Sequence, residues 1–301
     1  MFKLLSKESN IFSIPAYIGF LLLIVVAFSV PGFRLEHVFS AVITFAGVAL
    51  GYFTFNQIGL NYQMHLPLFL YTFFVVAFYN GGLDIGVAVA LLTNSFLLLL
   101  FTSTDDTLRN RNYVLVGSIL AINFIFLPTT WPMAIFAILH ITATSSRIPL
   151  NIMRLIFGMA VIFTAYFCVM FFLGFTAPDT AYLARPSSTF IRDFYPLQFL
   201  VPVLLLTLYA VLDHFRHYNE KSPVSRYKYT FMLTFTAAQF CTIFLYMGHH
   251  FEYLLLLSLP VSIILSRMLY FLPAYWMREL GLWLIIVCLL LFRMGNFFQF
   301  L

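Results

Sequence analysis

Charged residues are scarce in this sequence. Asp, Glu, Lys and Arg together make up 9% of its 301 residues, whereas about a quarter of the residues in a soluble domain are charged. Hydrophobic residues account for 62%, and the mean hydropathy is +0.96. A chain of this composition has too few polar side chains to cover a surface facing water, which excludes an ordinary soluble fold. We therefore predict a single integral membrane domain over residues 1–301.

Cysteine is also rare, and the familiar enzyme motifs are missing. The three cysteines, Cys168, Cys241 and Cys288, lie inside apolar segments and have neither metal-ligand spacing nor the pattern of a disulfide framework. The sequence has no Walker A loop, no GxGxxG, no HExxH and no GxSxG. We therefore predict neither a metal nor a cofactor.

The formal charge of +5 does not indicate nucleic acid as a partner. A nucleic-acid interface needs a basic surface interleaved with aromatic residues, and no such surface exists outside the apolar runs. An excess of Lys and Arg is instead typical of the cytoplasmic loops of membrane proteins. The predicted partners are membrane lipid and either a lipid-linked substrate or other membrane proteins.

What the sequence does contain is a succession of apolar runs, several of them about twenty residues long, as transmembrane helices require. Strands of a membrane barrel would alternate apolar and polar residues over about ten residues, and these runs do not alternate. The predicted fold is all-α, a polytopic transmembrane helix bundle of about 11 spans. The expected spans are 11–30, 37–55, 66–79, 83–101, two short spans within 113–143, 150–175, 197–212, 229–246, one ending near residue 267, and 276–292. A cleaved signal peptide is the alternative for the first of these runs.

The stretch Asp213–Lys228 is expected to be a cytoplasmic loop because it holds the densest group of cations in the chain, namely Arg216, Lys221, Arg226 and Lys228. The segment Tyr113–Ala143, broken by Pro128 and Pro132, forms either two short spans or one kinked span. With two spans, 12 of the 16 Lys and Arg residues lie on the cytoplasmic side, and with one span only 7 do. The positive-inside rule therefore favours eleven spans, a cytoplasmic N-terminus and an external C-terminus, in the cell inner (cytoplasmic) membrane.

This topology places a group of polar residues at the outer face, where they are the candidate site residues. Glu36 and Glu252 are the candidate catalytic acids. Arginine can hold a phosphate through two parallel hydrogen bonds, and His and Asp can bind polar groups of a substrate. The candidate substrate-binding residues are Arg34, His37, Asp84, Arg185, Arg192, His249 and His250.

Each of these residues also has a structural interpretation. The arginines could simply solvate an exposed loop, and His249 and His250 could belong to a turn at the membrane interface. His249 and Glu252, three residues apart, offer two ligands to a metal, but no third ligand is identified. His140, inside an apolar run, is either a functional intramembrane residue or a neutral histidine bonded to the backbone.

Three segments resemble an uncharacterised family of roughly 300-residue inner-membrane proteins of Bacteroidota. These segments are FKLLSKESNIFSIPAYIGFLLLIV near the start, NYQMHLPLFLYTFF before the third span, and HHFEYLLLLSLPVSIILSR. The resemblance implies a membrane location and implies no activity, cofactor or catalytic residue.

Our leading hypothesis from the sequence is a protein that handles a lipid-linked or envelope glycan substrate at the outer (periplasmic) face. Membrane glycosyltransferases that use lipid-linked sugars often place a catalytic acid in the first outward loop, where Glu36 lies here. The alternative is a non-catalytic subunit or scaffold of a membrane protein complex, because the loops are short and the helices are rich in aromatic residues. A transporter is the third possibility, and whether the protein is an enzyme is left open.

Overall fold

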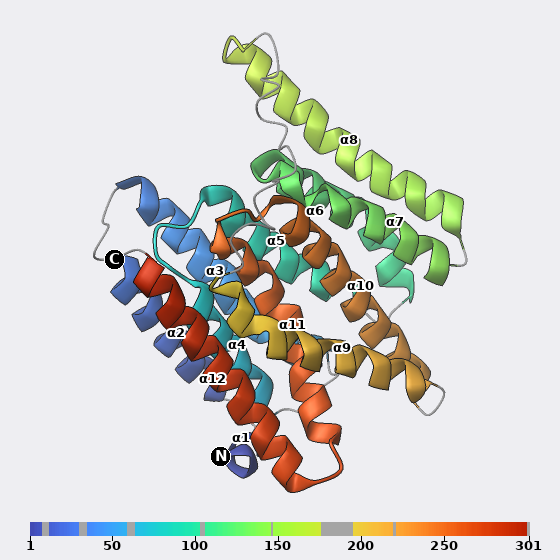
Figure 1. Cartoon of the computed structure of the whole chain (residues 1–301). Helices are drawn as coiled ribbons and strands as arrows, with labels where there is room; N and C mark the ends of the chain where they lie inside the picture. Colours follow the sequence, from blue (N-terminus) through green and yellow to red (C-terminus); the bar gives the residue numbers. More distant parts are fainter. Residues whose placement is uncertain are drawn as a thin grey trace.

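The computed structural model describes residues 1–7, 12–29, 35–58, 64–102, 106–145, 147–175, 195–218 and 221–299, which form helices and, within these ranges, no strand. The predicted all-α fold is confirmed (Figure 1). The α-helices are α1 (Phe2–Leu5), α2 (Ser13–Ser29), α3 (Leu35–Ile58), α4 (His65–Phe78), α5 (Ile85–Phe101), α6 (Asp106–Phe126), α7 (Trp131–Thr144), α8 (Ile148–Phe172), α9 (Val201–Arg216), α10 (Pro223–Tyr246), α11 (Leu255–Phe271) and α12 (Tyr275–Gln299). The short 3₁₀ helices are η2 (Pro128–Thr130), η5 (Leu197–Leu200) and η7 (Phe251–Leu254).

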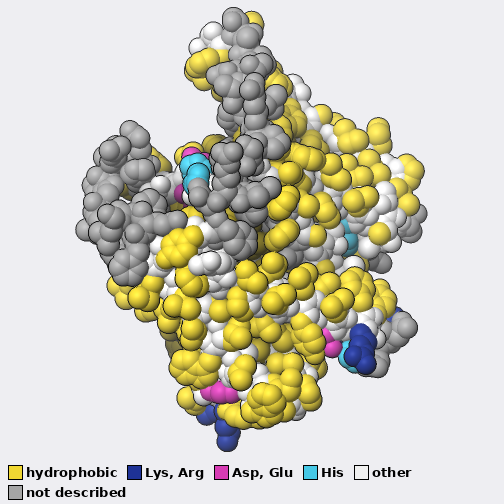
Figure 2. Space-filling model, in the orientation of Figure 1, with side chains coloured by type: hydrophobic (Ala, Val, Ile, Leu, Met, Phe, Trp, Pro, Cys, Tyr) yellow, Lys and Arg dark blue, Asp and Glu magenta, His cyan; other side chains and the backbone are white. Residues whose placement is uncertain are grey.

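Among the described residues, six helical segments are long and apolar enough to cross a membrane. They are Val38–Phe55, Ile148–Phe172, Leu197–Arg216, Pro223–Tyr246, Phe251–Phe271 and Tyr275–Asn296. Four shorter helices are also apolar: Ser13–Phe28, His65–Phe78, Ile85–Phe101 and Asn112–Phe126. The face shown in Figure 2 is largely hydrophobic, with lysine and arginine side chains near its lower edge and lower right. These features indicate a membrane protein.

One end of the bundle gathers the last residues of several helices around the start of α10. Lys228 Nζ donates a hydrogen bond to the carbonyl of Ile58, the last residue of α3, at 2.9 Å. The hydroxyl of Tyr227 donates to the carbonyl of Phe101, the last residue of α5, at 3.1 Å. Arg267, near the end of α11, donates to Ser225 Oγ at 2.9 Å. We call this end, where these cations lie, the cationic end.

The opposite end of the bundle gathers the starts of the same helices. Ser40 Oγ, in the second turn of α3, donates to the carbonyl of Leu83 just before α5 begins. At the start of α7, Trp131 Nε1 donates to the hydroxyl of Tyr246, the last residue of α10, at 2.7 Å. We call this end the Glu252 end. Consecutive helices from α2 to α12 therefore run in alternating directions between the two ends.

The segment Tyr113–Ala143, for which the sequence left two interpretations, belongs to two helices. The ring of Phe101, at the cationic end, lies 6.2 Å from the ring of Tyr113 near the start of α6 and 5.6 Å from that of His140 near the end of α7. Because the start of α6 and the end of α7 lie together, α7 runs back alongside α6. Proline lacks a backbone N–H and cannot continue a helix hydrogen-bond ladder, so the reversal falls at Pro128, in η2.

Two predicted loops are largely helical, and these predictions were wrong. The segment 102–112, which lies between two of the expected spans and was therefore expected to be a loop, is helical from Asp106, where α6 begins. Much of the expected loop Asp213–Lys228 is helical, because α9 continues to Arg216 and α10 begins at Pro223. The start of α10 has a local cause: Ser222 Oγ accepts a hydrogen bond from Ser225 N at 3.3 Å, and proline suits the first helical position. Apolar runs mark the part of a helix inside a membrane, and polar helix ends extend beyond them.

Helix α8 lies at one edge of the bundle and packs closely against α6 (Figure 1). Two glycines allow this approach. A Cβ atom on Gly117 would lie 2.0 Å from the carbonyl oxygen of Leu155, and one on Gly158 would lie 2.0 Å from that of Val114. Ser118 Oγ also donates to the carbonyl of Gly158 at 3.3 Å. Small residues at helix interfaces of this kind are typical of membrane proteins.

Candidate functional site

The turn between α10 and α11 forms the centre of the Glu252 end. Gly248 begins it with φ of +51°, a backbone conformation that glycine adopts without steric cost. The backbone N–H of His250 then bonds the carbonyl of Met247 at 2.8 Å, and that of Tyr253 bonds the carbonyl of His250 at 3.1 Å. These bonds hold the His249–Glu252 stretch in a compact turn at the mouth of α11.

Glu252 is the polar side chain that links this turn to a second loop. Its side chain is 22% exposed, and one carboxylate oxygen lies 3.8 Å from Nδ1 of His250, whose side chain is 73% exposed. Asp84 also lies close to this carboxylate. Asp84 precedes α5 directly, so the turn after α10 and the loop between α4 and α5 meet at this carboxylate.

The loop between α4 and α5 also contacts an arginine of α12. Gly81 and Gly82 have φ of +78° and +56° and shape the loop. The side-chain oxygen of Asn80 accepts a hydrogen bond from Arg293, in the last turns of α12. The Arg293 guanidinium also lies 4.5 Å from the centre of the Phe28 ring. The Glu252 end therefore combines two carboxylates with one arginine among its described side chains.

The structure brings together three of the predicted site residues, Asp84, His250 and Glu252. His249 is on the same turn and is exposed. Glu36 and His37 belong to the first turn of α3, and their side chains lie outside the described part of the structure. Ser40, one turn later, bonds the carbonyl of Leu83, so the start of α3 lies beside the loop that holds Asp84.

The predicted residues Arg34, Arg185 and Arg192 lie outside the described residues. Arg293 was not predicted as a site residue, because in the sequence it is only a cation near the end of the last apolar run. Its contact with Asn80 joins residues 213 positions apart in the chain, and no local pattern signals such a pairing.

Within the part of the chain that the structure describes, no group of three or more His, Cys, Asp and Glu residues could hold a metal.

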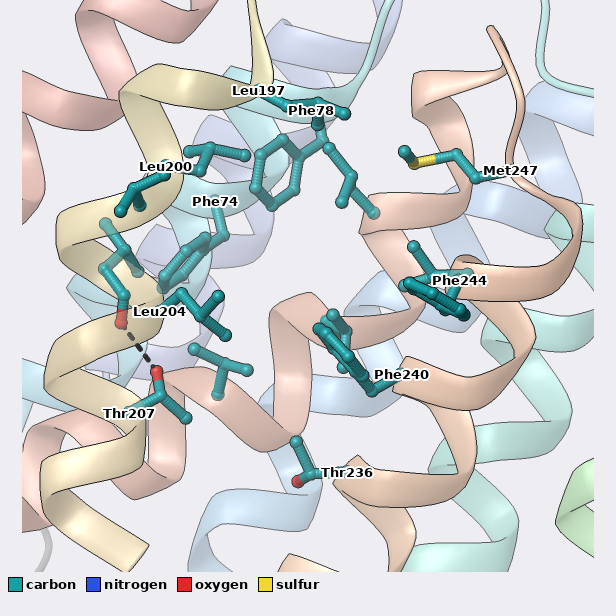
Figure 3. A pocket seen from close by; sticks show the side chains of 16 residues that line it. Phe74, Phe78, Leu197, Leu200, Leu204, Thr207, Thr236, Phe240, Phe244 and Met247 are labelled. Carbon is teal, nitrogen blue, oxygen red and sulfur yellow. Dashed lines mark hydrogen bonds between the residues drawn. The ribbon is translucent and has the colours of Figure 1, made fainter. Parts of the chain in front are cut away.

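A second feature that the sequence did not indicate is an apolar pocket between α4, α9, α10 and α11, with a volume of about 300 Å³. Figure 3 shows Leu200, Leu204 and Thr207 on one side of it and Phe240 and Phe244 on the other. Almost all of the side chains that line it are hydrophobic. The pocket lies between the consecutive helices α9, α10 and α11 and the distant helix α4, so only their packing creates it.

The pocket extends to the Glu252 end. Met247 and Leu254, which flank the His249–Glu252 turn in sequence, both line it. Leu254 belongs to the same 3₁₀ helix as Glu252. A pocket lined almost entirely by apolar side chains accommodates a hydrocarbon chain, and a carboxylate near its end can accept a proton or a hydrogen bond from a polar group attached to that chain.

The fold and the site define a helical membrane protein with an apolar pocket beside a polar turn. The model of a protein family described as "Family of unknown function (DUF6427)" matches residues 1–299, and the chain belongs to this family. Comparisons with the curated proteins and with the solved structures found no match.

Proposed function

We propose that this protein is a multi-pass inner-membrane protein with about eleven spans, a cytoplasmic N-terminus and an external C-terminus. In this topology the cationic end is cytoplasmic and the Glu252 end faces outward. Two observations support it. Consecutive helices alternate in direction, and the described cations other than Arg293 belong to the cationic end, as the positive-inside rule expects of a cytoplasmic face.

We further propose that the protein handles a lipid-linked substrate, such as an envelope glycan precursor, at its outer face. The observation that carries this proposal is the apolar pocket, which ends beside the turn that holds Glu252. The lipid chain would occupy the pocket between α9 and α10. Its polar head group would then lie at the Glu252 end, within reach of Asp84, His250 and Arg293.

The proposed roles follow from the chemistry of the side chains. Glu36 and Glu252 are the proposed acid and base residues. The side chain of Glu252 is only 22% exposed, and a largely desolvated carboxylate exchanges protons more readily near neutral pH than a solvated one does. Arginine binds phosphate through two parallel hydrogen bonds. The proposed substrate-binding residues are Arg34, His37, Asp84, Arg185, Arg192, His249 and His250.

Two replacements on neighbouring positions of α9 test the pocket. Leu204 lines it, whereas Leu205 is 60% exposed and does not. The protein would be purified in mild detergent, and the lipids that remain bound would be identified by mass spectrometry. We expect Leu204→Trp to fill the pocket and to remove a specifically retained lipid, while Leu205→Trp keeps it. Equal lipid retention by both variants, or none by the unmodified protein, contradicts the proposal.

Complementation tests the acids and arginines. In a strain that requires the gene, Glu36→Gln, Glu252→Gln, Arg185→Gln and Arg192→Gln would be introduced singly, and membrane levels of each variant measured by immunoblot. We expect at least one of the two glutamate variants to be present in the membrane and inactive. If all four variants complement fully, the proposed catalytic role is wrong.

Reporter fusions test the topology. A reporter that is active only outside the cytoplasm should be active when fused after Leu301 and silent when inserted after Lys221. Silence at both positions would mean an even number of spans and would contradict the proposed orientation of the C-terminus.

The second candidate function is a non-catalytic subunit of a membrane protein complex, and α8 is the observation that favours it. Along its outer face the side chains of Phe157 and Phe171 are 62% and 73% exposed, and the helix lies at the edge of the bundle. Gentle detergent extraction followed by mass analysis distinguishes the two functions. A stable monomer with no co-purifying protein would contradict this second function.

A further inference from the structure

The apolar pocket has one closed side and one open side. Its closed side is formed by α4 and α11, where Phe74 is 2% exposed and Val261 is 7% exposed. On the other side, Leu204 of α9 and Phe240 of α10 also line the pocket, but they are 41% and 43% exposed. Side chains that line a pocket and are also exposed mark its opening. We call the gap between Leu204 and Phe240 the side mouth.

The arrangement of α9 and α10 explains why a gap exists there. At the cationic end the two helices are in contact, because the ring of His214 in the last turn of α9 lies 4.3 Å from the ring of Tyr229 near the start of α10. Towards the Glu252 end the pocket separates them, with Leu204 on one side and Phe240 on the other (Figure 3). The two helices therefore diverge from the cationic end, and α11, against which both pack, lies behind the gap.

The side mouth opens towards the hydrocarbon region of the membrane. It lies within Leu197–Arg216 and Pro223–Tyr246, two of the segments that are long and apolar enough to cross a membrane. The exposed side chains of such segments face lipid. Leu205 and Leu208, on the outer surface of α9, are also apolar and exposed. A hydrocarbon chain can therefore pass from the bilayer into the pocket without crossing a polar surface.

The interior of the pocket suits one hydrocarbon chain. A water molecule takes up about 30 Å³ of the liquid and a methylene group a similar volume, so a pocket of about 300 Å³ holds about ten chain carbons. Two hydroxyl groups line the part nearer the cationic end. Those of Thr207 and Thr236 donate to carbonyl groups of their own helices, at 2.8 and 2.7 Å. Both protons are thus used within the protein, and neither needs a polar atom of a ligand.

We propose that a membrane lipid places one hydrocarbon chain in the pocket directly from the bilayer, through the side mouth. The head group of this lipid lies beside the His249–Glu252 turn, because Met247 and Leu254 line the pocket and flank that turn. The part of the chain that the pocket cannot hold extends through the side mouth into the bilayer. This inference rests on the proposed function, since it says how the lipid-linked substrate reaches its site.

A removable bridge across the side mouth tests this entrance. The three natural cysteines would be replaced by alanine, and Leu204→Cys and Phe240→Cys introduced together. A reagent with two maleimide groups joined by a disulfide would then link the two new thiols. The control pair is Leu205→Cys with Leu208→Cys. These positions are three residues apart on the exposed surface of α9 and do not line the pocket, so the same bridge there leaves the side mouth open.

The probe is octadecyl phosphate, a single-chain lipid whose chain is too long for the pocket alone. Each bridged protein would be incorporated into phosphatidylcholine nanodiscs, given the probe, and released into a mass spectrometer together with the lipids that it retains. We expect the bridge between Leu204→Cys and Phe240→Cys to abolish retention of the probe, and the bridge on the control pair to leave retention unchanged. Reduction of the disulfide in the first sample should restore retention, because it reopens the entrance.

The outcomes separate this inference from the proposed function. Loss of the probe that is confined to the first bridged protein and reversed by reduction supports the side entrance. Equal retention by both bridged proteins overturns the side entrance and leaves the lipid-binding pocket of the proposed function in place. Loss that reduction does not reverse also overturns it, because the bridge then does not act by closing an entrance. Absence of retention by the unbridged protein overturns both.

Discussion

The two ends of the helix bundle differ in how their polar residues are used. At the cationic end, the first turns of α10 contact the last residues of α3, α5 and α11 through Lys228, Tyr227 and Ser225. At the Glu252 end, Asp84, His249 and His250 are exposed, and His250 Nδ1 lies 3.8 Å from the nearest carboxylate oxygen of Glu252. Polar side chains stabilise the fold at the first end and remain available to a ligand at the second.

The direction of the helices gives a physical reason for this difference. Helices α3, α5 and α11 end at the cationic end, where their last carbonyl groups need donors and carry partial negative charge. Lys228 supplies such a donor to Ile58, and Arg278 Nε donates to the carbonyl of Leu272, just after α11, at 2.7 Å. The same helices begin at the Glu252 end, where Asp84 precedes α5 and Glu252 lies just before α11. Acids are favoured at such positive helix starts.

This arrangement bears on the positive-inside rule. Two of the cations that predict a cytoplasmic face, Lys228 and Arg278, also donate to carbonyl groups at helix ends. Two separate physical causes therefore place these cations at the cationic end. One is the positive-inside rule, and the other is the need of the carbonyl groups at helix ends for hydrogen-bond donors. If polar side chains stabilise the fold mainly at the cationic end, variants at that end should lose more stability than variants at the Glu252 end.

The largest loss of stability is expected from Tyr229→Ala. The ring is 2% exposed and contacts His214, Lys221 and Arg267, and removing a buried aromatic side chain costs about 3 kcal/mol or more. Chemical denaturation in detergent, followed by circular dichroism, measures the loss. Trp276→Ala is the control, because Trp276 belongs to the same end and is 65% exposed. Equal losses in both variants would show that the contacts of Tyr229 do not stabilise the cationic end.

A smaller loss is expected from Lys228→Met, which keeps the length of the side chain and removes the donor to Ile58. A hydrogen bond from a charged group contributes about 1.5–3 kcal/mol, and its loss should loosen the end of α3 in particular. Hydrogen exchange followed by mass spectrometry should show faster exchange near residue 58. Lys3→Met removes an exposed cation and should leave that exchange unchanged. Unchanged exchange in Lys228→Met would contradict the capping role.

The smallest effect on stability is expected at the Glu252 end, from His250→Gln. The His250 side chain is 73% exposed, and exposed ion pairs contribute at most about 1 kcal/mol. The denaturation midpoint should therefore change less than that of Lys228→Met under the same conditions. A loss as large as that of Lys228→Met would mean that the Glu252 end is also held together by its polar side chains.

Much of the fold follows from the apolar runs. The expected spans 37–55, 66–79, 83–101 and 276–292 correspond to α3, α4, α5 and α12. The helix boundaries near Asp106 and Pro223 were missed, because both helices begin in polar sequence and the prediction followed hydrophobicity alone. The Ser222–Pro223 pair was a local signal for the second of these boundaries.

Less of the site could be predicted. Asp84, His250 and Glu252 stood out because charged and histidine residues are rare beside apolar runs, and the structure brings these three together. The contact of Arg293 with Asn80 and that of Arg267 with the Tyr229 ring join residues far apart in the chain, and a single sequence carries no record of such pairings.

By itself, the sequence determined the all-helical class of the protein and most of its helices, because the scarcity of charge and the length of the apolar runs leave no other way to satisfy the backbone in a membrane. Only the tertiary structure decided which helices are neighbours. The packing of α4, α9, α10 and α11 creates the apolar pocket, and that of α9, α10 and α11 brings His214, Tyr229 and Arg267 together. Apolar helices can pack in many arrangements that bury similar amounts of apolar surface. Only specific contacts, such as the close approach of Gly158 to Val114, select one of them.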